Sequence, residues 1–73
     1  MSTQIVMGQT GDRRHQFDPQ NARELAEAEK RFKELTEKGF TAAERTMTGE
    51  TIKAASFDPA AQETVFFPRL VGG

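Results

Sequence analysis

The sequence predicts an α+β protein in which one long helix packs on one face of a mixed sheet of four or five strands. Between Asp18 and Gly39, apolar residues recur at spacings of three and four, which is the period of an amphipathic helix. Short runs rich in β-branched and aromatic residues lie before and after this segment, and turn residues separate them. The expected order of elements is therefore ββαβββ, in a chain of 73 residues that has room for one domain.

The first two expected strands form a hairpin. The first is the apolar run Gln4-Ile5-Val6-Met7, and Thr10-Gly11 follows as turn chemistry because glycine tolerates positive φ. The chain then returns over residues 13–17, where Phe17 is the one clear core residue. Two residues of this return fall where inward-facing apolar side chains are expected: Arg13 and His15.

The helix is expected from Pro19 to Lys38. Asp18 suits the N-cap, Pro19 suits the first helical position, and Gly39 suits the stop. Four residues form its apolar stripe: Leu25, Ala28, Phe32 and Leu35. Three acid-first i,i+4 pairs are expected on its wet side: Glu27–Arg31, Glu29–Lys33 and Glu34–Lys38.

A second hairpin is expected over residues 40–47 and 51–57, with Thr48-Gly49-Glu50 as its turn. A last strand over residues 64–67 ends at Pro68, because proline cannot donate to a ladder. The tripeptide Phe-Asp-Pro occurs at residues 17–19 and again at 57–59. We interpret both as turns at strand exits with an aspartate cap rather than as an internal repeat. The stripe of the helix is expected to meet four sheet residues: Ile5, Met7, Phe17 and Phe66.

Composition restricts the function. The chain has no cysteine and one histidine, so thiol chemistry and a histidine-based metal site are not expected. Ten basic and eleven acidic residues are interspersed and leave a net charge of -1, which argues against nucleic acid or an anionic membrane as partner. No apolar stretch approaches the ~18 residues of a membrane span, and no signal-peptide pattern is evident. The expectation is a cytoplasmic globular protein.

The sequence ends in Gly72-Gly73, directly after the run from Thr64 to Val71. Two glycines carry no side chain to anchor them and cost the most backbone entropy to order. Such a pair is a poor structural end, but it suits a carboxylate that must enter another protein's active site. The pattern predicts that the tail serves a partner enzyme.

These features resemble ubiquitin and its bacterial relatives, the sulfur-carrier proteins, which share the β-grasp fold. Gln4-Ile5-Val6, Thr10-Gly11 and Phe17-Asp18-Pro19 resemble the opening of ubiquitin. The run from Phe66 to Gly73 resembles the tail of the small subunit of molybdopterin synthase, although Arg69 stands where sulfur carriers usually have a second proline.

The resemblance implies a β-grasp domain over residues 1–69 and a flexible tail over residues 70–73. It implies that Gly73 supplies the carboxylate that is adenylated and conjugated, and that Gly72 allows close approach of enzyme backbone. Recognition by partners is expected from four residues: Arg69, Leu70, Val71 and Phe67. In the register that the resemblance implies, Phe66 points into the core and Phe67 lies with Val65 on the outer face.

The leading hypothesis is a prokaryotic ubiquitin-like modifier that is a substrate and not itself an enzyme. It needs no cofactor of its own, because the partner activating enzyme uses ATP and Mg²⁺. A conjugating enzyme, a deconjugating protease and target proteins are further expected partners, and the free protein is expected to be a monomer. Two alternatives stay open: a sulfur carrier with a thiocarboxylate on Gly73, and a small binding module with an incidental Gly-Gly end.

Overall fold

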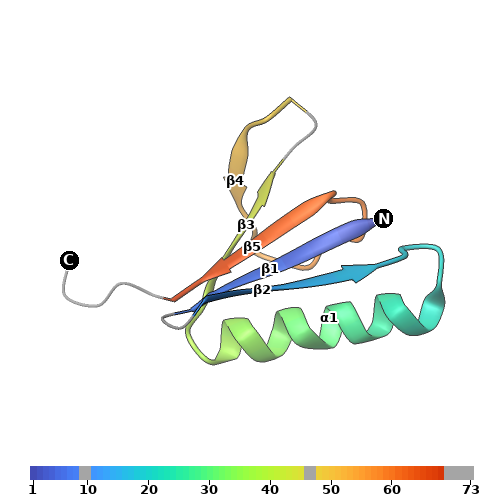
Figure 1. Ribbon diagram of the computed structural model, residues 1–73, viewed down its shortest axis with the longest axis horizontal. Helices are drawn as coiled ribbons and strands as arrows, with labels where there is room; N and C mark the ends of the chain where they lie inside the picture. Colours follow the sequence, from blue (N-terminus) through green and yellow to red (C-terminus); the bar gives the residue numbers. More distant parts are fainter. Residues whose placement is uncertain (9–10, 46–47, 69–73) are drawn as a thin grey trace.

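The structure, a computed structural model, describes residues 1–8, 11–45 and 48–68. One helix packs on one face of a five-stranded sheet with the order β2-β1-β5-β3-β4 (Figure 1). β1 and β5 are parallel and the other neighbours are antiparallel, so the sheet is mixed. The elements are β1 (Ser2–Gly8), β2 (Gly11–Phe17), α1 (Ala22–Glu37), β3 (Thr41–Arg45), β4 (Thr51–Lys53) and β5 (Glu63–Phe67). The predicted α+β class is confirmed, and the arrangement is compatible with the β-grasp fold.

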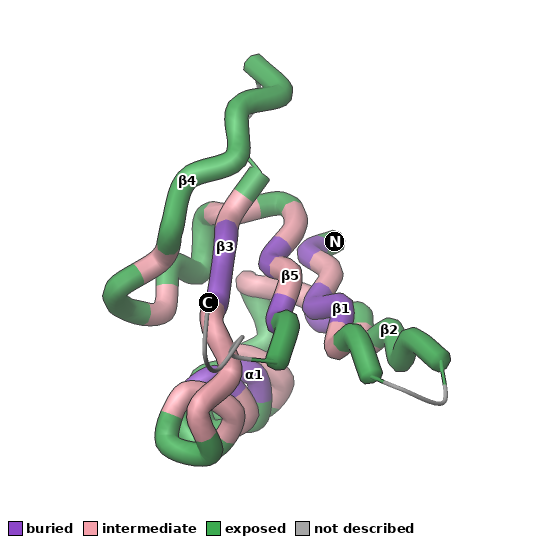
Figure 2. Tube along the Cα trace, turned by 90° about the vertical axis from the view of Figure 1, so that its left-hand side faces the viewer, coloured by how far each residue is buried: buried purple, intermediate pink, exposed green. Residues whose placement is uncertain are grey.

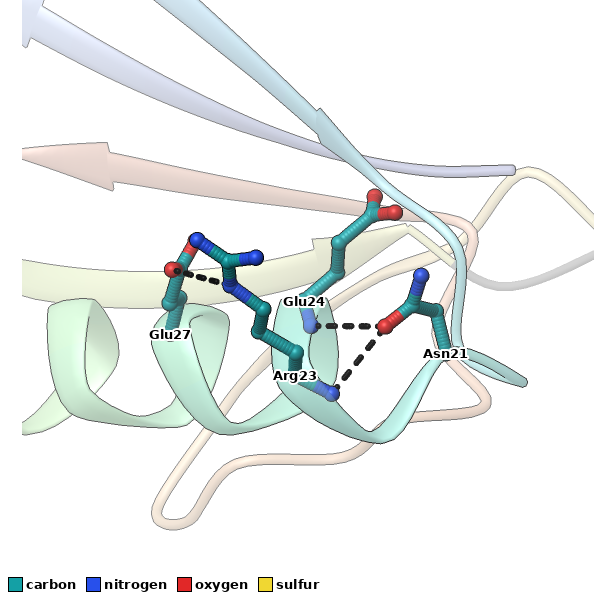
Figure 3. Close-up of polar contacts among 4 residues, drawn as sticks. All are labelled: Asn21, Arg23, Glu24 and Glu27. Carbon is teal, nitrogen blue, oxygen red and sulfur yellow. Dashed lines mark hydrogen bonds and ion pairs between the residues drawn. The ribbon is translucent and has the colours of Figure 1, made fainter.

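The helix begins at Ala22 because Asn21, and not Asp18, is its N-cap. The Asn21 side-chain oxygen accepts from the backbone N–H of Arg23 at 3.1 Å and of Glu24 at 3.2 Å (Figure 3). These two bonds satisfy donors that have no partner within the helix. The predicted start was therefore a few residues early, since the chain holds two good capping residues and the later one lies at the first helical turn.

Asp18 instead closes a turn, and its counterpart at Asp58 does the same. The Asp18 carboxylate accepts from the N–H of Gln20 at 2.9 Å, and the Asp58 carboxylate accepts from the N–H of Ala60 at 2.9 Å. In each turn the aspartate carbonyl also accepts from the residue three positions on, Asn21 or Ala61. Both Phe-Asp-Pro tripeptides thus form the same aspartate-capped turn, as the sequence indicated, but only the first of them directly follows a strand.

Gly39 ends the helix as predicted. Its φ of +99° lies in the region that favours glycine. The N–H of Gly39 donates to the carbonyl of Thr36 at 3.1 Å, and the N–H of Phe40 donates to the carbonyl of Leu35 at 3.0 Å. This pair of bonds is the Schellman motif, and Leu35 and Phe40 both pack against the core, as that motif usually requires.

The apolar stripe of α1 faces the sheet. Ala28 and Phe32 are buried, whereas Leu25 and Leu35 are half-buried. The three predicted acid-first pairs are wrong. The ion pairs within the described helix are instead base-first and exposed: Arg23–Glu27 and Lys30–Glu34.

Rings of phenylalanine make the centre of the core. Phe66 of β5 is fully buried and meets Phe32 of α1 edge-on, with ring centroids 5.6 Å apart. The Phe57 ring lies 5.9 Å from that of Phe32 and 6.0 Å from that of Phe17. The two Phe-Asp-Pro turns therefore bring their phenylalanines together over the helix.

The orientation of β1 differs from the prediction. Gln4 is fully buried toward α1, and Val6 packs against the core cluster on the same side. Because successive side chains of a strand point to opposite faces, Ile5 and Met7 lie on the outer face, away from the helix. The predicted contacts of the helix with Ile5 and Met7 are wrong, and Gln4 takes the inner position because both ends of its amide find hydrogen-bond partners.

The second hairpin is present but shorter than predicted. β3 is described as far as Arg45, and the predicted residues 46–47 lie outside the described residues. β4 ends at Lys53 and not at residue 57, and the chain then turns back so that Phe57 reaches the core. All of β4 is exposed, and the β3–β4 hairpin extends away from the helix and from the other strands (Figures 1 and 2).

Candidate functional site

Most of the predicted site lies outside the described residues. This holds for the two glycines of the expected conjugation site and for three residues of the expected recognition stem: Gly72, Gly73, Arg69, Leu70 and Val71. The boundary expected at residues 69–70 falls there as well. The described part of the site is the end of β5, where Phe67 is followed by Pro68.

β5 carries the chain toward this site from the middle of the sheet. It pairs in parallel with β1 and antiparallel with β3, so both of its edges are occupied. Phe66 is fully buried toward the helix, whereas Phe67 is 37% exposed and lies across from Thr41. The predicted alternation of these two phenylalanines is confirmed, and it places Phe67 on the outer face of the sheet.

The outer face has an apolar centre with a cation at each edge. The strand registers align Arg14, Ile5, Val65, Ala43 and Lys53 in one row across all five strands. Ile5 is 9% exposed and Ala43 6%, although the helix lies on the other face. The side chains of neighbouring strands therefore cover the middle of this row, and Arg14 and Lys53 at its two ends are exposed.

Met7 and Phe67 form the exposed apolar part of this face. Val6 pairs with Phe66, and Met7 and Phe67 are the next residues of these two parallel strands, so both side chains point to the outer face. Met7 is 41% exposed and Phe67 37%. Two large apolar side chains that water reaches, next to the strand that leads to the tail, are suited to contact with a protein partner. We call Met7, Phe67, Ile5 and Val65 the outer patch.

The sequence pointed to Phe67 but missed Ile5 and Met7. Both were assigned to the core because an apolar strand normally turns its larger residues inward. Alternation alone could not correct this, because it separates Ser2, Gln4 and Val6 from Ile5 and Met7 without showing which set faces the helix.

A polar cluster lies on the helix-facing side of the sheet. Nε2 of Gln4 donates to the Ala28 carbonyl at 3.0 Å, and Arg31 donates to Oε1 of Gln4 at 2.7 Å. Burial lowers the pKa of His15 below its ordinary value, and the charges of Arg31 and Arg13 lower it further. The predicted inward position of Arg13 and His15 is confirmed, since both lie on the same face as Phe17, but β2 stays largely exposed there.

The carboxyl group of Glu44 on β3 has a raised pKa. Burial raises its pKa, and the nearby charge of Asp58 raises it further. Among the described residues, no group of three or more His, Cys, Asp or Glu side chains is placed to hold a metal ion. None of the helices described is long and apolar enough to cross a membrane.

Shallow clefts lie along α1, and two of them border the sheet or Phe57. One of about 370 Å³ lies at its C-terminal end against Phe40, Thr41 and Lys53, and one of about 270 Å³ lies between the helix and Phe57. Both are open to solvent and not enclosed.

Fold and site together define a small α+β domain of β-grasp arrangement with an exposed apolar patch beside its central strand. Comparison with protein families, curated proteins and solved structures finds no match for the chain.

Proposed function

We propose that the chain is a ubiquitin-like protein modifier that is activated at the carboxylate of Gly73 and conjugated to target proteins. The observation that carries the proposal is the position of β5. This strand is held on both edges, buries Phe66 and exposes Phe67, and precedes the Gly-Gly sequence by a few residues. Such a strand is a firm base from which a partner enzyme can take up the segment that follows.

The chemistry explains why glycine is needed. A carboxylate is a poor electrophile, so one of its oxygens must first attack the α-phosphate of ATP and expel pyrophosphate. A thiol or amine then attacks the carbonyl carbon of the acyl-adenylate, and AMP leaves. A partner enzyme supplies the ATP, the Mg²⁺ and the reacting groups. Gly72 and Gly73 supply a narrow chain without a Cβ that would block its passage into that enzyme.

The tail is tested by separating activation from folding. Deleting Gly73 or changing Gly72 to Ala is expected to leave the melting temperature unchanged but to abolish adenylation by the cognate activating enzyme, measured as ATP–pyrophosphate exchange. Arg69→Ala is expected to act more mildly, because an exposed charge contact contributes roughly 0–1 kcal/mol. Normal activation of a protein that lacks Gly73 would refute the proposal. The intact mass of the protein from its native cells shows whether Gly73 is its last residue.

The outer patch is tested by two matched substitutions. Phe67→Ser and Met7→Ser are expected to raise the KM for the activating enzyme with little effect on kcat, because they remove contact area and leave the reacting carboxylate in place. Ile52→Ser is the control, since Ile52 is 51% exposed but lies on the helix side of the sheet. An equal loss in all three variants would mean that general surface hydrophobicity, not the patch, is recognised.

The sulfur-carrier alternative predicts a different product. The same activation would end in a thiocarboxylate, which intact mass reports as replacement of one oxygen by sulfur, whereas a modifier gives larger protein adducts. Pro68 after Phe66-Phe67 is the feature that favours the carrier. Absence of both products with every activating enzyme tested would leave a small binding module.

A further inference from the structure

β2 is an open edge of the sheet. Its one strand neighbour is β1, and its residues are exposed except for His15, which is half-buried, and Phe17, which is buried. Figure 2 shows β2 as the outermost element on one side of the molecule, exposed over most of its length. In an antiparallel pair, alternate residues of an edge strand turn both N–H and C=O away from the neighbour. Within the part of the chain that the structure describes, no other group bonds to this edge along residues 12–16.

The side chains of this edge place one arginine on each face of the sheet. Arg13 pairs with Val6, whose side chain faces the helix, and Arg14 pairs with Ile5, whose side chain faces outward. Both arginines are exposed, and neither is in an ion pair with any residue that the structure describes. On the helix side Arg31 adds a further cation, because its charge and that of Arg13 both act on His15.

Charged side chains on an edge strand usually prevent accidental pairing with other strands. On β2 the two arginines also determine which kind of strand can pair with it. Two consecutive arginines repel a basic segment on both faces. In an antiparallel pair, a second copy of β2 can place Asp12 opposite Arg14 only by setting the two Arg13 side chains opposite each other, and in an in-register parallel pair each arginine meets its own copy. An acidic segment meets neither difficulty, since it gains a cross-strand ion pair on each face.

We infer that β2 binds an extended acidic segment of a partner protein as an additional strand, with two consecutive carboxylate residues opposite Arg13 and Arg14. Consecutive residues of the incoming strand point to opposite faces, so an adjacent pair of acids matches the adjacent pair of arginines. Backbone hydrogen bonds to β2 hold the segment, and the two ion pairs select it. The β2 edge shares no residue with the outer patch, although Arg14 pairs with Ile5 of that patch. The inference uses only β2 and its charges, so it does not rest on the proposed function.

The direct test uses the peptide acetyl-Thr-Val-Glu-Glu-Val-Thr-amide with uniformly ¹⁵N-labelled protein. Amide resonances of β2 are expected to shift, and their hydrogen exchange to slow, while those of β4 and of Phe67 stay unchanged. The peptide with Lys-Lys in place of Glu-Glu is expected not to bind. Shifts centred elsewhere, or a concentration-dependent dimer without peptide binding, would overturn the inference.

A charge swap tests the role of the arginines. The double variant Arg13→Glu, Arg14→Glu is expected to lose affinity for the Glu-Glu peptide about fivefold or more and to prefer the Lys-Lys peptide. Arg45→Glu is the matched control, because it reverses an exposed arginine on β3. Circular dichroism shows that each variant is folded. An unchanged preference in the double variant refutes selection by these two arginines.

N-methylation of the peptide tests strand pairing separately from charge. Two isomers carry N-methyl groups on the two alternate sets of residues. One isomer is expected to bind as the parent does and the other to lose binding, because only one set of N–H groups faces β2. Equal binding of both isomers would show electrostatic attraction without an added strand and would overturn the inference.

Discussion

The Gln4 amide is fully buried between β1 and α1, where it donates to the Ala28 carbonyl and accepts from Arg31. A shift of β1 by one residue would bring Ile5 and Met7 to the helix but would turn this amide out of its hydrogen bonds. The observed orientation keeps the amide satisfied, and Ile5 is still buried because neighbouring strands cover it on the outer face. Gln4 therefore determines which side of β1 is turned toward the helix, since a buried amide without hydrogen-bond partners would be costly.

Substitution of Gln4 tests this account. Gln4→Met keeps the volume and leaves the Ala28 carbonyl with its bond within the helix, so we expect a stability within about 1 kcal/mol of wild type. Gln4→Glu replaces the donor by a second oxygen that faces the Ala28 carbonyl, and we expect a loss of roughly 1–3 kcal/mol at pH 7. Urea unfolding measures both. Equal stability of the Glu variant and wild type would show that attraction between the new carboxylate and Arg31 offsets the lost donor to Ala28.

Glu44 makes stability depend on pH. Burial and the charge of Asp58 raise its pKa in the folded protein, so folding favours the protonated form. The carboxylate therefore destabilises the folded state at neutral pH, and this effect disappears as pH falls below the ordinary pKa of about 4.3. Glu44→Gln is expected to raise the melting temperature at pH 7 and to match wild type near pH 4. Glu29→Gln, an exposed residue of α1, is the control. An equal gain at both pH values would refute the electrostatic cause.

At the scale of elements, local sequence signals predicted the type and order of the helix and strands. Tertiary contacts determined where each of them begins and ends. The helix was predictable because its apolar period and its Gly39 stop are local. Its start was misplaced because Asp18 and Asn21 are both good caps and only the turn at Asp18 decides between them. β4 is shorter than predicted because the chain turns back so that Phe57 packs against the core. A local sequence pattern does not contain this contact, because it is made with residues of other elements.

The presence of each strand was easier to predict than which of its side chains face the helix. Phe66 and Phe67 point to opposite faces of the sheet as expected. β5 is paired on both edges, and the helix covers the face on which Phe66 lies. β1 was assigned the wrong way round, because apolar pattern alone favours Ile5 over Gln4. The hydrogen-bond partners of Gln4 come from a helix more than twenty residues away, and no strand-level pattern contains them. The same limit concealed the outer patch.

At the scale of the whole molecule, stability depends on few side chains. The core cluster joins Phe32, Ala42 and Phe66, and Phe57 and Phe17 extend the ring contacts toward the start of α1. A domain of this size has a free energy of unfolding of roughly 4–11 kcal/mol. One core ring is therefore a large fraction of the total, whereas the exposed residues of β2 and of the outer face can change with little effect on folding.

Phe32→Ala is the substitution that tests this distribution. Phe32 is 4% exposed and its ring contacts two others, so its removal is expected to cost about 3–5 kcal/mol through lost burial and a cavity. Thermal unfolding followed by circular dichroism is expected to show a melting temperature lowered by tens of degrees or a chain that is unfolded at 25 °C. Phe67→Ala, which truncates the neighbouring ring of β5 on the outer face, is expected to cost much less. An unchanged melting temperature for Phe32→Ala would mean that the helix is not held by this face. Equal losses in both variants would place the stabilising apolar contacts on the outer face as much as beneath the helix.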